Sequence, residues 1–210
     1  MATNPLLIPT LNQAITDVVN LLNEFADDSL FTEKVRLVFG VDVSSQVFKA
    51  LIADLPEIEV VGDEVLQGAL GAFSTQTGKI YLSQGLVSGD INKLEAILIE
   101  EIGHYVDAQV NAADSPGDEG AIFSAFTRGV PLTPEQIQFL ESLDDNALIT
   151  LDGQTIQVEQ SSISDSGGEG GTTKILQLDP LPAGQQDKGS ITVKYSYEHF
   201  SIPDQFTIRY

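Results

Sequence analysis

The chain has no cysteine, only 2 histidines and only 10 basic residues among its 210. Without cysteine, a disulfide framework is excluded, and so is any site in which a thiolate binds metal or attacks a substrate. The 10 basic residues stand against 31 acidic ones, which gives a formal net charge of −21. This charge opposes binding to nucleic acid or to an anionic membrane surface. Cations, or a salty and calcium-rich exterior, suit it better.

Long apolar runs are also missing, since none approaches the roughly 20 residues that a membrane-spanning helix needs. We therefore expect no membrane span. Residues 1–11 lack the basic start of an ordinary secretory signal, so export would need another route. The absence of cysteine does not identify a compartment, since an exported protein that avoids cysteine would have the same composition. The 42% apolar content at this length allows one sizeable core and a smaller appended unit.

Four regions follow from the pattern of apolar residues. Residues 1–40 are expected to form two amphipathic helices that make an N-terminal cap, the first beginning at Thr10. Residues 41–160 are expected to form the main domain. Residues 161–173 are dominated by serine and glycine and indicate a flexible linker. Residues 174–210 alternate as short strands and stop within a strand pattern, which favours either pairing onto the main body or truncation of a longer chain.

The main domain mixes helix and strand signals, which predicts the α+β class. A helix capped by Ser44 or Ser45 precedes a short strand and a hairpin over residues 71–82. A capping box begins a later helix at Thr133. Further elements are indicated by Gly40 as the end of the second helix, by a long helix at 90–111, by a helix at 121–128 and by a hairpin around Asp152-Gly153.

The long helix at residues 90–111 carries the candidate chemistry. One stripe of this helix is apolar and faces a core. Glu100, His104 and Asp107 lie roughly opposite that stripe, one turn apart, and Glu101 lies at its edge. Gly103 within the helix costs roughly 0.5–1 kcal/mol relative to alanine, so we expect another backbone or a substrate to approach closely there. The stripe consists of Ile91, Leu94, Leu98, Ile102 and Tyr105.

The run Glu100-Glu101-Ile102-Gly103-His104, followed by Tyr105-Val106-Asp107, resembles the H-E-x-G-H-x-x-D motif of zincin-like metallopeptidases. Glu100 stands where that motif has its first histidine. The resemblance implies a zincin-like fold in which Glu100 and His104 bind zinc and Glu101 is the general base. The extra carboxylate favours harder cations, so calcium is an alternative ion. The acidic, cysteine-free surroundings resemble exported bacterial calcium-binding proteins, and this resemblance implies a secreted or cell-surface location.

The resemblance also implies a third ligand and a substrate-binding strand. Glu119 is the candidate ligand on the following segment, and Asp118 and Asp107 are alternatives. Asp118 and Glu119 would equally suit the first turn of a helix by complementing its dipole. The strand before the motif helix is expected to form the edge of the cleft, where it would bind an extended peptide by strand addition. That strand contains Ile80, Tyr81 and Leu82.

Two functions and a structural alternative follow. The first is a metal-dependent peptidase with Glu101 as the base, cleaving a peptide, a protein or its own chain. The second is a non-catalytic zincin-like interaction or calcium-binding module of a larger surface or secreted protein, in which Glu100 records a lost zinc site. The third is a purely structural helical domain, in which the motif match is a coincidence. His199, the other histidine, fits a surface or packed side chain better than a metal ligand.

Overall fold

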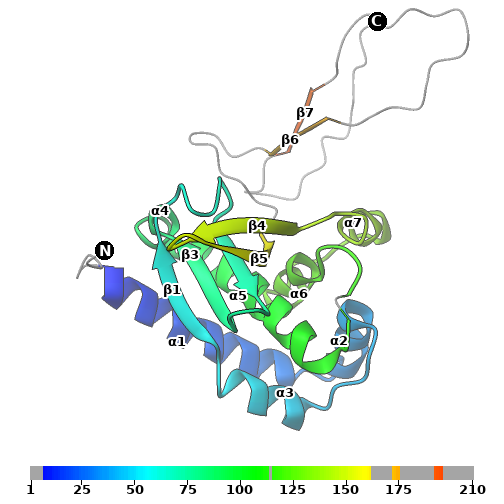
Figure 1. The fold of residues 1–210 in the computed structure, drawn as a ribbon. Coiled ribbons are helices and arrows are strands. Elements are labelled where there is room, and N and C mark those ends of the chain that lie inside the picture. Colours follow the sequence, from blue (N-terminus) through cyan, green and yellow to red (C-terminus); the bar gives the residue numbers. More distant parts are fainter. Residues whose placement is uncertain (1–6, 114, 162–171, 176–191, 196–210) are drawn as a thin grey trace, which may run out of the picture. The chain divides into compact units, whose positions relative to one another are not determined.

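The computed structural model describes residues 7–113, 115–161, 172–175 and 192–195 (Figure 1). It divides into two compact units, residues 1–162 and residues 163–210. The described part contains helices α1 to α7 and strands β1 to β7, which confirms the predicted α+β class. No described helix has the length and apolarity that crossing a membrane requires.

The second unit contains one described feature, an antiparallel pair of strands. They are β6 (Thr172–Ile175) and β7 (Thr192–Tyr195). The remainder of the region expected to be β-rich, including His199, lies outside the described residues, as does most of the linker expected at residues 161–173.

Three helices open the first unit: α1 (Leu7–Ala26), α2 (Phe31–Phe39) and α3 (Ser45–Ile52). Helix α1 already includes Leu7, so the predicted start at Thr10 is wrong. Pro9 is accommodated because the amides of a first helical turn have no intrahelical partner. The predicted end of α2 is confirmed, since Gly40 adopts a left-handed conformation with φ of 70° and donates its N–H to Arg36 O.

A mixed sheet of five strands follows, in the order β1-β3-β2-β5-β4. Strand β1 runs parallel to β3, and the other neighbours are antiparallel. Both predicted hairpins are present, β2–β3 and β4–β5. In the second turn Asp152 and Gly153 have φ of 51° and 78°, the conformation of a type I′ turn. The strands are β1 (Glu57–Val61), β2 (Gly71–Ser74), β3 (Lys79–Ser83), β4 (Asn146–Leu151) and β5 (Gln154–Gln160).

Strand β3 is not an edge strand, so that prediction is wrong. It pairs with β1 on one side and with β2 on the other. Its residues Ile80, Tyr81 and Leu82 are at most 1% exposed. Because both rows of backbone groups are already paired, β3 cannot bind a peptide by strand addition. The outer strands of the sheet are β1 and β4.

The motif helix, α5 (Ile91–Val110), lies behind the sheet at the centre of the first unit (Figure 1). Asp90 caps it by accepting a hydrogen bond from Asn92 N at 2.8 Å. The ring of Phe73 on β2 packs edge-on against Tyr105 of α5 at 6.0 Å between centroids. Helices α1 and α6 (Glu119–Thr127) also contact α5.

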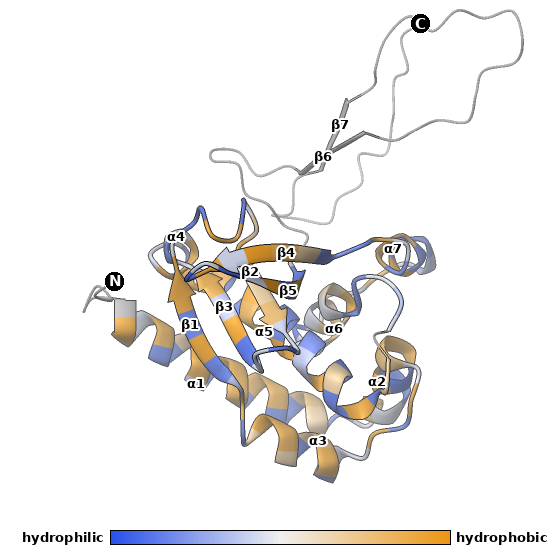
Figure 2. Ribbon diagram, viewed as in Figure 1, coloured by the Kyte–Doolittle hydropathy of each residue, from blue (hydrophilic) through white to orange (hydrophobic). Residues whose placement is uncertain are grey.

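Figure 2 shows hydrophobic residues along the strands and along α5. The short helices α4 (Gln84–Val87) and α7 (Pro134–Leu140) complete the unit.

Aromatic side chains join the N-terminal helices to α6. Phe123 of α6 lies 5.5 to 6.0 Å, between ring centroids, from three phenylalanines of α1, α2 and α3. Burying rings of this size supplies much of a core's free energy. The two helices expected as an N-terminal cap therefore pack as part of the same core as the motif helix. The three partners of Phe123 are Phe25, Phe39 and Phe48.

Candidate metal centre

One histidine and six carboxylic acids gather where α5, the start of α6 and the β4–β5 hairpin meet. Five of the acids are at most 8% exposed, and the sixth is 13% exposed at its side chain. Isolated charges are very rarely buried to this degree unless they are paired or bind a cation. The seven residues are Glu100, Glu101, His104, Asp118, Glu119, Asp145 and Glu159, and we call them the acidic cluster.

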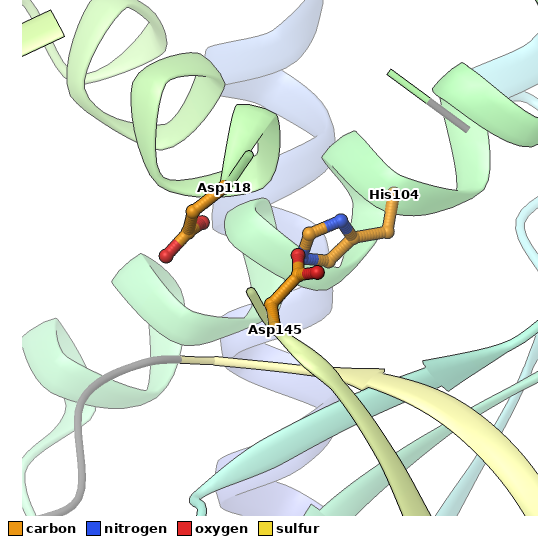
Figure 3. Close-up of side chains that lie close together, drawn as sticks. All are labelled: His104, Asp118 and Asp145. Carbon is orange, nitrogen blue, oxygen red and sulfur yellow. The ribbon is translucent and has the colours of Figure 1, made fainter. Parts of the chain in front are cut away.

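His104 lies between two pairs of acids, Glu119 with Glu159 and Asp118 with Asp145. Its Nδ1 lies 2.7 Å from Glu119 Oε1 and 3.3 Å from Glu159 Oε2. Its Nε2 lies 3.8 Å from Asp145 Oδ2. Because an ionised carboxylate can only accept, Nδ1 is the donor to Glu119. Figure 3 shows His104 projecting from α5 with the Asp145 carboxylate beside its ring and Asp118 on the neighbouring helix. Nε2 is thus the nitrogen left for a ligand.

Many polar atoms of the acidic cluster have no hydrogen-bond partner. A buried polar group without a partner costs about 1–3 kcal/mol, and more when it is charged. These atoms come from six residues on three elements, so a cation among them would satisfy several at once. They are Glu100 Oε1, both carboxylate oxygens of Glu101, His104 Nε2, Asp118 Oδ2, Glu119 Oε2 and Asp145 Oδ2.

Burial changes the acid–base behaviour of the cluster. It raises the pKa of Glu100 and Glu101 well above the usual value, and the charge of Asp118 adds to the effect on both. Burial also raises the pKa of Asp145 to about 7. For His104, burial alone would lower the pKa, but the Glu119 carboxylate beside Nδ1 raises it well above the usual value. A cation binds the deprotonated form of such groups, so its binding would displace protons from them.

Two sets of three residues could each hold a metal ion, since their ligand atoms all lie within 4.8 Å of one another. One is His104, Asp118 and Asp145; the other is His104, Glu119 and Glu159. Because Nδ1 already donates to Glu119, the first set is the better ligand set. Glu119 and Glu159 then orient the imidazole, as carboxylates commonly do for histidine ligands.

The predicted site residues are distributed unevenly around this centre. His104 and Asp118 belong to the first ligand set, whereas Glu119 lies on the opposite side of the ring. Glu100 and Glu101 are buried in the acidic cluster but belong to neither set. Asp107 instead accepts hydrogen bonds from Asn111 Nδ2, Ser115 N and Ser115 Oγ. It therefore fastens the loop that leads to Asp118.

The glycine of the motif helix makes room for another backbone, as predicted. A Cβ added at Gly103 would lie 3.0 Å from the Cα of Gly120 in α6. A Cβ at Gly120 would lie 2.5 Å from His104 Nε2. This pair of glycines lets the first turn of α6 approach the imidazole, and so brings Asp118 and Glu119 to the two sides of the ring.

Sequence reasoning missed Asp145 and Glu159. Neither acid belongs to the motif or lies near it in the sequence. The signal was the hairpin turn at Asp152-Gly153, because its register pairs Asn146 with Glu159. That pairing puts two acids at the open end of one hairpin. Nothing in the local pattern, however, shows that this end lies over α5.

Comparison of this chain with protein-family models, curated proteins and solved structures gives no match. The resemblance to zincin-like metallopeptidases therefore rests on the motif residues of α5.

Proposed function

We propose that this chain is a metal-binding domain that holds one divalent cation in the acidic cluster, through His104 Nε2, Asp118 and Asp145. The observation that carries this proposal is the set of buried, unpartnered atoms around Nε2. One imidazole nitrogen with two carboxylates suits zinc, manganese or iron(II) better than calcium or magnesium, which prefer oxygen ligands only. Zinc is our first choice of ion.

The test is metal binding by the full chain after chelation and dialysis, measured by calorimetry with zinc, manganese and calcium. We expect one zinc ion per chain in the wild type. Asp145→Asn and Asp118→Asn remove one anionic ligand each and should weaken binding by at least about tenfold. Asp152→Asn is the matched control, because it removes the same charge from the exposed turn of the same hairpin. Equal zinc binding in all four proteins would contradict the proposed ligand set.

A second candidate, metal-dependent cleavage of peptide bonds, is favoured by Glu101. Both of its carboxylate oxygens are buried and have no hydrogen-bond partner. It is on the same helix as His104, three residues before it. A carboxylate in this position could accept a proton from water and pass it to a leaving amine. A bound cation would supply Lewis-acid activation of the reacting groups.

Glu101→Gln separates these two candidates. Glutamine keeps the size of the side chain but cannot act as a base, and Glu101 belongs to neither ligand set. If the domain is a peptidase, zinc-dependent cleavage of a peptide library, or of the chain itself, should fall by about 100-fold or more while zinc content is retained. Cleavage at the wild-type rate would eliminate Glu101 as the base. Zinc binding without cleavage in the wild type would leave a non-catalytic binding module.

A further inference from the structure

We propose that the β4–β5 hairpin is a cover over the metal centre that the bound cation locks in place. This inference rests on the proposed cation site but concerns a different property, the coupling between the ion and one segment of the fold. Asp145 directly precedes the hairpin and Glu159 lies near its end, while the other members of the acidic cluster come from α5 and from the start of α6. An ion that binds acids from the hairpin and residues from the helices would therefore connect the hairpin to α5 and α6.

Backbone pairing attaches the hairpin to the rest of the sheet over a short length. Its two strands pair with each other over six positions, from Asn146↔Glu159 to Leu151↔Gln154. Strand β5 pairs with β2 at two positions only, Ala72↔Gln160 and Phe73↔Glu159. The hairpin can therefore keep its own ladder while these two pairs open.

The two faces of the hairpin have opposite environments. On one face Ile149, Ile156 and Val158 are buried in an apolar cluster with Leu66 and Tyr81, which anchors the hairpin. Glu159 alternates with these residues and so lies on the opposite face, where it reaches His104, and Asp145, just before β4, reaches the same ring. The two acids there meet the carboxylates of Asp118 and Glu119. Like charges at close range repel most strongly where water is excluded. Without a cation we therefore expect the end that carries Asp145 and Glu159 to separate from α5, with the apolar face as the pivot.

If the end of the hairpin that carries Asp145 and Glu159 opened, it would also expose Glu101, the candidate general base. Gly71, the first residue of β2, packs directly against the Glu101 carboxylate. Ser161, which follows the hairpin, covers Gly71. Ser161 N donates to Gly71 O at 3.3 Å, and Gly71 N donates to Ser161 Oγ at 3.1 Å. Separation of residues 159–161 from β2 would free an edge of that strand beside Glu101. The same movement that releases the ion would thus admit a ligand to a centre that is otherwise closed.

Hydrogen exchange of the full chain, followed by mass spectrometry with zinc and with a chelator, tests this proposal. We expect amides of residues 154–161 to exchange at least about tenfold faster in chelator, whereas those of residues 94–99 in α5 change little. Metal content is measured on the same samples. If zinc binds but amide protection changes equally in the hairpin and in α5, or changes in neither, the proposed movement of the hairpin is wrong, whereas the proposed metal site is supported. If no ion binds, both proposals fail.

A charge variant gives a second, independent test. Asp145→Asn combined with Glu159→Gln removes both carboxylates from the hairpin and keeps the size of each side chain. Without the repulsion, residues 154–161 should stay protected in chelator as well as they are in the zinc-bound wild type. Asp152→Asn is again the control and should behave as the wild type does. Fast exchange of the double variant in chelator would overturn the proposal, provided its circular dichroism shows that it is folded.

Discussion

The imidazole of His104 has a different neighbour at each nitrogen, and this asymmetry assigns the roles of the surrounding acids. Glu119 accepts from Nδ1 at 2.7 Å, so its contribution is to fix the ring and direct Nε2 toward Asp118 and Asp145. Glutamine can still accept this hydrogen bond, but alanine cannot. We predict that Glu119→Ala weakens zinc binding by about 10- to 100-fold, while Glu119→Gln weakens it less.

Calorimetric titration of the two Glu119 variants checks this prediction. If glutamine and alanine weaken zinc binding equally, the charge of Glu119 matters rather than its hydrogen bond, and Glu119 would then be a ligand itself, as the sequence suggested.

Gly103 is a second residue whose role is local. Alanine in its place would gain roughly 0.5–1 kcal/mol of helix propensity. Its Cβ, however, would lie 3.0 Å from the Cα of Gly120 and 3.0 Å from Phe123 Cδ1. Overpacking of this kind typically costs about 1–3 kcal/mol. We therefore predict that Gly103→Ala lowers the free energy of unfolding by about 1 kcal/mol, measured by urea denaturation in chelator. An increase in stability would show that α5 and α6 separate easily.

At the scale of elements, helix α6 combines a cap and a ligand in one residue. Asp118 Oδ1 accepts from Ala121 N at 2.8 Å, which caps the helix, while Oδ2 has no hydrogen-bond partner. Asparagine keeps the cap but loses the charge, whereas alanine loses both. We predict that Asp118→Asn leaves stability in chelator nearly unchanged and that Asp118→Ala lowers it by about 0.5–2 kcal/mol.

Thermal unfolding of the two Asp118 variants, with and without zinc, makes the comparison. Both should lose most of the stabilisation by zinc. If Asp118→Asn is stabilised by zinc as strongly as the wild type, Asp118 is only a cap.

Most elements could be predicted from the sequence because their signals are local. Gly40 ends a helix, Thr133 begins one with a capping box, and Asp152-Gly153 makes a hairpin turn whatever surrounds them. The sheet order could not be predicted in this way. Whether β3 lies at an edge depends on β1 pairing in parallel from a distant part of the chain, and no turn between them records it.

The same division holds for the candidate site. Residues of one helix, such as Glu100 and His104, share a face through helical periodicity, so the sequence predicts that they lie close together. Asp145 and Glu159 reach the ring of His104 only because the β4–β5 hairpin packs over α5. This contact depends on tertiary packing, which the sequence pattern did not reveal.

At the scale of the whole molecule, we expect the acidic cluster to make the folded state less stable as the pH rises. Carboxyl groups whose pKa is raised by folding stabilise the folded state fully below their unfolded pKa, and this contribution is lost as the pH rises through the folded pKa. For Asp145 that window runs from 3.8 to about 7, and the pKa of Glu100 and Glu101 is raised as well. We predict that the melting temperature in chelator falls between about pH 5 and pH 8.

Zinc should reduce or reverse this fall, because a cation binds the deprotonated ligands and does so more strongly as the pH rises. Differential scanning calorimetry across this range, with zinc and with chelator, gives the comparison. A melting temperature in chelator that rises with pH over the same window would mean that the carboxylates are already stabilised in their charged form without an ion.

We propose that a divalent cation satisfies the buried acids around His104. Elemental analysis of the full chain, after incubation with zinc and removal of unbound metal, tests it most directly when the wild type is compared with His104→Ala. Our account predicts one zinc ion per wild-type chain and none in the variant, with both proteins folded by circular dichroism. A folded wild type that retains no metal, or a His104→Ala variant that retains as much as the wild type, would contradict it.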